Sequence, residues 1–171
     1  TVDIVTGTPG CVARKTVADV DGDLLWLGPG GVYSMKQTAE GNARGAALPI
    51  SWPVQGWIDR INWPAAHRAL ATVDPQRHLY YLAVPVDGST VPNAVLVYDF
   101  AGRQWQSWDT NQHITSGVQF AVTTDLWGER CPFFTCGANP LDIYAVTPGA
   151  DCDLKRGATL EWEPLEITTI L

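Results

Sequence analysis

The hydrophobic pattern is clearest between residues 69 and 109, where four apolar runs are separated by turn residues. The runs cover residues 69–73, 78–84, 94–100 and 104–108. The second is rich in aromatic and branched side chains, which suit a pleated surface. The third is almost wholly apolar, so we expect both of its faces to be covered. Four short antiparallel strands of this kind are typical of one blade of a β-propeller.

Similar apolar runs lie on both sides of this stretch. Upstream, the pattern predicts strands over 11–20, 24–27 and 32–35, with a hairpin at Asp21-Gly22 and an exposed, polar loop over 36–48. Downstream, it predicts strands over 117–123, 131–136 and 141–146. Residues 158–162 and 165–171 form either one strand interrupted at Pro164 or two strands.

One segment, 49–62, changes to a helical period. Its apolar residues recur at i, i+3, i+4 and i+7 (Val54, Trp57, Ile58 and Ile61). Ser51 is a candidate N-cap and Pro53 suits the first turn. We therefore predict one short amphipathic helix that ends near Trp63-Pro64 and lies across an edge of the blade.

Three segments share a pattern of a bulky strand, a turn, and a second strand with an aliphatic residue followed by tyrosine. The tyrosines are Tyr33, Tyr98 and Tyr144. The interval between the last two suits a propeller blade of about 40–50 residues, and the predicted helix lengthens the earlier interval. The predicted fold is all-β: antiparallel blades of a partial propeller, about three in number, with one short helix. Such blades bury their faces only by stacking, and three do not close a ring. We therefore expect residues 1–171 to be one β-propeller segment of a longer chain.

Composition narrows the function classes. Of the 171 residues, 46% are hydrophobic and 17% are charged, which is typical of a globular protein. The net charge of −7 argues against broad attraction to nucleic acid or an anionic membrane. An acidic wall would repel DNA, which suits a conduit through which DNA slides. No run approaches the roughly twenty apolar residues of a membrane span.

Candidate metal and catalytic patterns are weak. The four cysteines (Cys11, Cys131, Cys136 and Cys152) match no strong zinc spacing. We expect them to be reduced and buried; a Cys131–Cys136 disulfide and a zinc site completed by histidine are the alternatives. Asp19, Asp21 and Asp23 fail the EF-hand pattern, which needs glycine at its sixth position and glutamate at its twelfth.

Paired carboxylates at Glu161 and Glu163, or at Asp99 and Asp109, are explained by exposed strand faces and turns. The sequence therefore predicts no catalytic residue, no metal site and no cofactor, and an enzyme is the least favoured class.

Three tryptophans are candidates for contact with a ligand or a partner. Trp52, Trp57 and Trp127 could stack on sugar rings if they are exposed, or pack in the core or at an interface. Packing is the more common role of such residues.

Three sequence signatures support a family resemblance. The first is VDGDLLWL at 20–27 followed by GGVYSM at 30–35; the second is LAVP at 82–85 followed by NAVLVYD at 93–99; the third is GRQW at 102–105. Together they resemble propeller-forming structural proteins of bacteriophage tails, including the tail nozzle proteins of short-tailed phages. The similarity covers about 17–108, and a weaker similarity extends to the last residue.

The resemblance implies a structural virion protein located in the tail, as part of a channel or tip assembly. Its implied partners are other tail subunits, further copies of the chain as a homo-oligomer and, transiently, the genomic DNA. The alternative is a receptor- or carbohydrate-binding module at the tail tip.

Overall fold

The strands of the chain form three antiparallel sheets. The computed structural model describes residues 9–43, 48–110, 120–124, 130–135, 143–145 and 163–165. The first sheet contains β1 (Ala18–Val20), β2 (Asp23–Gly28) and β3 (Gly31–Ser34). The second contains β4 (Leu70–Asp74), β5 (Leu79–Val84), β6 (Ala94–Asp99) and β7 (Gln104–Thr110). The third contains β8 (Phe120–Thr124), β9 (Arg130–Thr135), β10 (Ile143–Ala145) and β11 (Glu163–Leu165).

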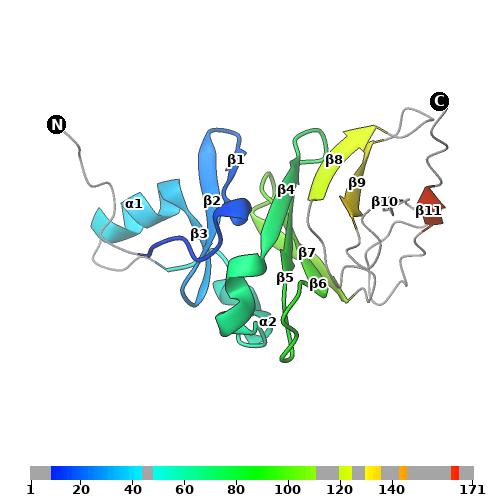
Figure 1. The fold of residues 1–171 in the computed structure, drawn as a ribbon. Coiled ribbons are helices and arrows are strands. Elements are labelled where there is room, and N and C mark those ends of the chain that lie inside the picture. The colour runs from blue at the N-terminus through cyan, green and yellow to red at the C-terminus, as the bar shows by residue number, and fades with distance from the viewer. Residues whose placement is uncertain are drawn as a thin grey trace.

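Each sheet is a simple meander, in which strands that follow one another along the chain pair in an antiparallel manner. The three sheets follow one another across the molecule in chain order (Figure 1). The first strands of the three meanders are neighbours, because β4 adjoins both β1 and β8. The prediction of a β-rich, antiparallel fold is therefore confirmed. The described strands form open sheets and no closed ring.

The repeated tyrosines occupy equivalent positions. Tyr33 pairs with Trp26 across β2 and β3, Tyr98 pairs with Tyr80 across β5 and β6, and Tyr144 pairs with Phe134 across β9 and β10. In each meander the tyrosine therefore lies directly opposite an aromatic residue of the preceding strand. Directly opposed residues are the closest neighbours in a sheet, so the repeat in the sequence corresponds to a repeated register.

The main core lies between the first and second sheets. The first sheet contributes mainly aliphatic side chains, and the second adds two tyrosines (Val20, Leu25, Leu27 and Val32; Tyr80, Leu82, Val84, Leu96 and Tyr98). Ile58, Ile61 and Ala66 from the connecting segment complete this core. Every residue of β5, and all of β6 except its last, is buried. The prediction that β6 is covered on both faces is thus confirmed.

The hairpin between β1 and β2 forms as the sequence predicts. Asp21 and Gly22 have φ values of +52° and +71°, which give a two-residue turn whose twist matches that of the strands. The carboxylate of Asp19 accepts a hydrogen bond from the Gly22 amide at 2.9 Å. The carboxylate of Asp19 therefore stabilises the turn.

The segment before β1 differs from its predicted strand over 11–20. Only the last three residues form a strand, because a short 3₁₀ helix, η1 (Arg14–Thr16), precedes them. The buried hydroxyl of Thr16 donates to the Ala13 carbonyl at 2.6 Å and accepts from the Leu27 amide at 3.0 Å. A side chain that bonds locally to the backbone competes with a strand ladder, which explains the turn.

Residues 36–48 were predicted to be an exposed loop, and this prediction is wrong for most of the segment. A helix, α1 (Met35–Ala43), follows β3 directly and lies outside the first sheet (Figure 1). Ser34 accepts a hydrogen bond from the Gln37 amide at 3.1 Å and so caps the helix. The signal in the sequence was the spacing of Ser34 and Gln37, which matches a capping box.

The prediction of a single helix over 49–62 is also wrong. The segment contains a 3₁₀ turn, η2 (Trp52–Val54), and one helical turn, α2 (Gln55–Ile58), before η3 (Trp63–Arg68). Ser51 caps neither element, because its hydroxyl accepts from the Val32 amide at 2.9 Å and so satisfies the outer edge of β3. The predicted apolar face is confirmed in part, since Ile58 and Ile61 are buried in the core.

The downstream strands agree in part with the prediction. β8, β9 and β10 overlap the predicted strands over 117–123, 131–136 and 141–146. Pro164, predicted to interrupt a strand, lies within β11 and opposite Tyr144. Residues 158–162 and 166–171 lie outside the described residues. Within the described part of the chain, no helix has both the length and the apolar character needed to cross a membrane.

Candidate functional site

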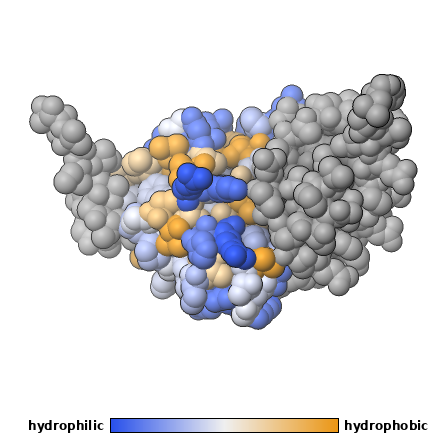
Figure 2. Space-filling model, in the orientation of Figure 1, coloured by the Kyte–Doolittle hydropathy of each residue, from blue (hydrophilic) through white to orange (hydrophobic). Residues whose placement is uncertain are grey.

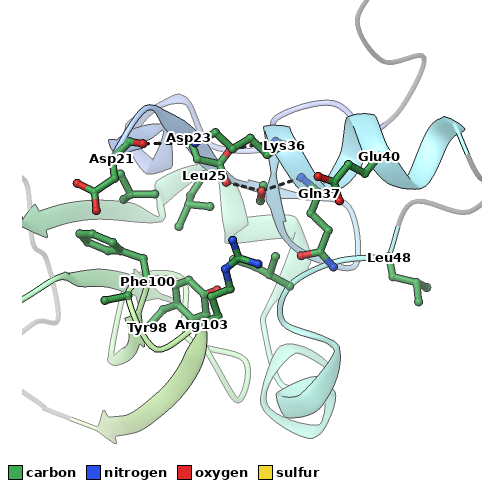
Figure 3. Close-up of a pocket in the computed structure, with 14 residues that line it drawn as sticks. Asp21, Asp23, Leu25, Lys36, Gln37, Glu40, Leu48, Tyr98, Phe100 and Arg103 are labelled. Atoms are coloured by element: carbon green, nitrogen blue, oxygen red, sulfur yellow. Dashed lines mark hydrogen bonds between the residues drawn. The ribbon is translucent and has the colours of Figure 1, made fainter.

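An open cleft of about 670 Å³ lies between the first sheet and the turn that joins β6 to β7 (Figure 3). Val20, Leu25 and Tyr98 are among the residues that line it. Its rim carries charged side chains of both signs, among them Asp21, Asp23, Lys36, Glu40 and Arg103. Polar and charged groups therefore make up much of the surface of this cleft, which suits a polar ligand.

Asp23 organises the wall of the cleft where β2, β3 and α1 meet. Its carboxylate accepts hydrogen bonds from the Ser34 hydroxyl at 2.5 Å and from the Lys36 amide at 3.0 Å. The Lys36 ammonium donates to the Asp21 carbonyl at 3.3 Å. A carboxylate at the first turn of a helix is favoured both by these free amides and by the helix dipole. This wall is therefore held by its own hydrogen bonds.

This capping network gives the first prediction. Replacing Ser34 by alanine removes the acceptor for the Gln37 amide and one donor to Asp23, so we expect the protein to lose about 1 kcal/mol of unfolding free energy. Urea unfolding measures the loss. The matched control is Gln37→Ala, which keeps the backbone amide that the cap binds and should change stability less. Equal losses in the two variants would contradict the capping role.

The opposite wall comes from the end of β6 and the turn after it. The Asp99 carboxylate accepts a hydrogen bond from the Gly102 amide at 2.8 Å, and Arg103 follows in the left-handed region at φ +53°. Figure 3 shows the Arg103 guanidinium near the middle of the cleft. Burial raises the pKa of the Tyr98 hydroxyl, and the positive charge of Arg103 opposes that rise.

A β-bulge fixes the outer strand of this wall. The register between β6 and β7 shifts after Val97, so that Tyr98 pairs with Trp105 and Gln106 is left over. Trp105 then packs on Tyr98, with ring centroids 5.0 Å apart, and donates to the Ile50 carbonyl at 3.0 Å. These contacts tie β7 to the segment that covers β3.

The tryptophans predicted as candidate ligand or interface residues do not form this site. Trp52 is 62% exposed on η2. Trp57 is half-buried on α2, where the Arg60 guanidinium lies 4.4 Å from the ring centroid. Neither lines the cleft. Trp127 lies outside the described residues.

Arg60 also forms a two-point ion pair with Asp87, which fastens α2 to the loop after β5. Its Nε donates to the Asp87 carboxylate at 2.9 Å, and its terminal nitrogen bonds the second oxygen. The hydrogen bond from Arg60 lowers the pKa of the Asp87 carboxyl. Arg60 thus contacts both Trp57 and Asp87, and the role of Trp57 as a ligand or interface residue stays a prediction.

The structure also shows the surroundings of several other residues that the sequence analysis singled out. Cys11 is free and exposed, so the prediction that it is buried is wrong. The side chains of the other three cysteines lie outside the described part of the structure. Asp99 serves its turn, with a further hydrogen bond from Gln106 at 3.1 Å. Among the described residues, no group of histidine, cysteine, aspartate and glutamate could hold a metal ion.

The face of the molecule seen in Figure 2 mixes apolar and strongly hydrophilic side chains. Basic residues occur in the last turns of two 3₁₀ helices: Arg14 and Lys15 in η1, His67 and Arg68 in η3. All four are exposed. These pairs precede β1 and β4, so the net acidity of the chain is not evenly distributed.

Comparison with known proteins adds no family to this description. No protein-family model matches the chain, and no curated protein matches it.

Proposed function

We propose that the chain is a structural component of a phage tail, in which propeller-like meanders stack as part of a ring and no reaction is catalysed. The observation that carries the proposal is the adjacency of β1, β4 and β8. These are the first strands of three successive meanders, and in a propeller the first strands of successive blades line the central axis. The family resemblance noted from the sequence supplies the assignment to a tail.

The packing of the sheets supports the same proposal. The first sheet packs on one face of the second through the shared core, and β4 of the second sheet adjoins β8 of the third. Stacking of this kind continues until a ring closes, so further meanders are needed from more chain or from more copies. Leu24, on the opposite face of the first sheet from the core residue Leu25, is 38% exposed and is a candidate contact for the next meander.

The charges favour a tip or platform over a uniformly acidic conduit. Arg14 and Lys15 before β1 and Arg68 before β4 would place positive charge near the starts of the first strands, where DNA phosphates would be attracted. The net charge of −7 must then be concentrated elsewhere. A transient contact with the genome is accordingly proposed at that end only.

Assembly of the full chain tests the proposal. Native mass spectrometry should give one oligomer with a fixed number of copies, and electron microscopy should show a closed ring. Leu24→Glu should shift the mass to that of the monomer while the circular dichroism spectrum stays unchanged. The control is Gln76→Ser, because Gln76 is an exposed polar residue in the turn between β4 and β5, outside the strands.

The tail assignment needs a separate measurement. In particles of the phage that encodes the chain, an antibody raised against it should label the tail. A chain that remains monomeric at high concentration and labels no particle would contradict both parts of the proposal.

A further inference from the structure

We propose that the cleft between the first and second sheets binds one acidic saccharide unit, with Arg103 taking the carboxylate of the sugar. The proposal rests on this cleft alone and goes beyond the ring assembly proposed above. Failure of the saccharides to bind would not change the result of the assembly experiment. A chain that stays monomeric would still contain the cleft.

The first argument is the position of Arg103. Its backbone is held in the left-handed region by the turn at Asp99, and the side chain extends into the middle of the cleft (Figure 3). The turn region is exposed, and no residue in the described part of the chain forms a hydrogen bond or ion pair with the guanidinium. A guanidinium presents its donors in a planar fork that matches a carboxylate.

The second argument concerns the groups that surround this cation. Glu40 and Gln37 line the α1 side of the cleft and Asp21 lies on the other side. Carboxylates repel a doubly charged phosphate ester more strongly than a singly charged carboxylate, and they accept hydrogen bonds from hydroxyl groups. The Gln37 amide both donates and accepts. The surroundings therefore favour a ligand with one carboxylate and several hydroxyls.

The third argument is the aromatic wall. Phe100 is half-buried, and its ring is packed against His78 with ring centroids 5.4 Å apart and planes 86° apart. Figure 3 shows the Phe100 ring on the Asp21 side of the cleft. The C–H face of a pyranose packs well on such an apolar surface. The volume of about 670 Å³ lies within the range of about 300–1,000 Å³ that is usual for small-molecule sites.

Calorimetric titration of the full chain tests the proposal with glucuronic acid and glucose, which differ at C6, where one carries a carboxylate and the other a hydroxymethyl group. We expect glucuronic acid to bind at least about tenfold more tightly, because its carboxylate can form charge-assisted hydrogen bonds with Arg103 that the hydroxymethyl group of glucose cannot form. N-acetylneuraminic acid, titrated in parallel, distinguishes a sialic acid from a uronic acid as the preferred unit. Inorganic phosphate is the anion control and should bind more weakly than either sugar acid.

Variants then assign the binding to the cleft. Arg103→Gln should remove the preference for glucuronic acid over glucose, whereas Arg14→Gln, at an exposed position on η1 outside the cleft, should retain it. Phe100→Leu should weaken both sugars while the acid is still preferred. Circular dichroism confirms that each variant is folded.

Three results would overturn the proposal. The first is equal binding of glucose and glucuronic acid, or no binding of either. The second is an unchanged preference in Arg103→Gln. The third is an affinity for phosphate as high as that for the sugar acids, because the cleft would then be a general anion site.

Discussion

Replacing Leu82 by alanine is expected to lower the free energy of unfolding by about 2–5 kcal/mol. Leu82 lies in the middle of β5, between Ala71 and Leu96 in register, and its side chain is fully buried in the core shared by the first and second sheets. Truncation removes buried apolar surface and leaves a cavity that two paired strands prevent from collapsing. Urea unfolding followed by tryptophan fluorescence measures the loss.

The matched control is Leu24→Ala in β2. The same atoms are removed, but Leu24 is 38% exposed while Leu82 is 0% exposed. The control should therefore lose much less stability than the core variant. A similar loss at both positions would mean that the sheets do not share the core described above.

Replacing Tyr80 by phenylalanine is expected to cost about 1–3 kcal/mol. The Tyr80 hydroxyl donates to the Thr16 carbonyl at 2.8 Å, and both residues are fully buried. Phenylalanine keeps the ring and the packing but leaves this carbonyl without its donor. The bond joins η1 to β5, so the loss is expected to loosen the chain before β1 as well; hydrogen exchange at the Thr16 and Leu27 amides reports on that part.

Tyr98→Phe serves as the comparison for this variant. Tyr98 also lies in the shared core, but it lines the open cleft, whereas Tyr80 is fully buried. The loss in Tyr98→Phe should therefore be the smaller one. A larger loss there would assign the effect of Tyr80→Phe to the ring environment and not to the bond with Thr16.

The same tyrosines predict how stability depends on pH. Burial raises the pKa of Tyr80 strongly, and that of Tyr33 and Tyr98 to a lesser degree. The folded protein retains these protons where the unfolded chain releases them, so stability is complete below pH about 10 and decreases as the pH rises above it. Urea midpoints measured between pH 8 and 11 should decline, and the decline should be shallower in Tyr80→Phe because one of the three groups is gone.

The sequence predicted the strands that depend on local signals. The runs of β5 and β6 are apolar because both faces are covered, and Asp21-Gly22 forms the turn that its residues favour. The repeated tyrosines were visible as a pattern, and this pattern corresponds to a repeated register in the three meanders. The helix α1 was missed although Ser34 and Gln37 carried a capping signal, because its residues show no strong apolar face.

The cleft could not have been predicted from the sequence. Its walls come from β2, α1 and the turn after β6, and only the packing of two sheets brings Arg103 toward Glu40. The tryptophans were chosen for their size and chemistry, but their burial and neighbours depend on the tertiary structure, as Trp57 under Arg60 illustrates.

By itself, the sequence determined an antiparallel β-rich chain built on a repeated strand pair, because strand and turn preferences act over a few neighbouring residues. The tertiary structure alone decided that Ser51 satisfies β3 and does not cap a helix, and that a bulge turns Trp105 onto Tyr98. It also decided that a mixed-charge cleft opens between two meanders. These outcomes depend on which distant backbone groups remain unsatisfied after the sheets have packed, and that is a property of the whole fold.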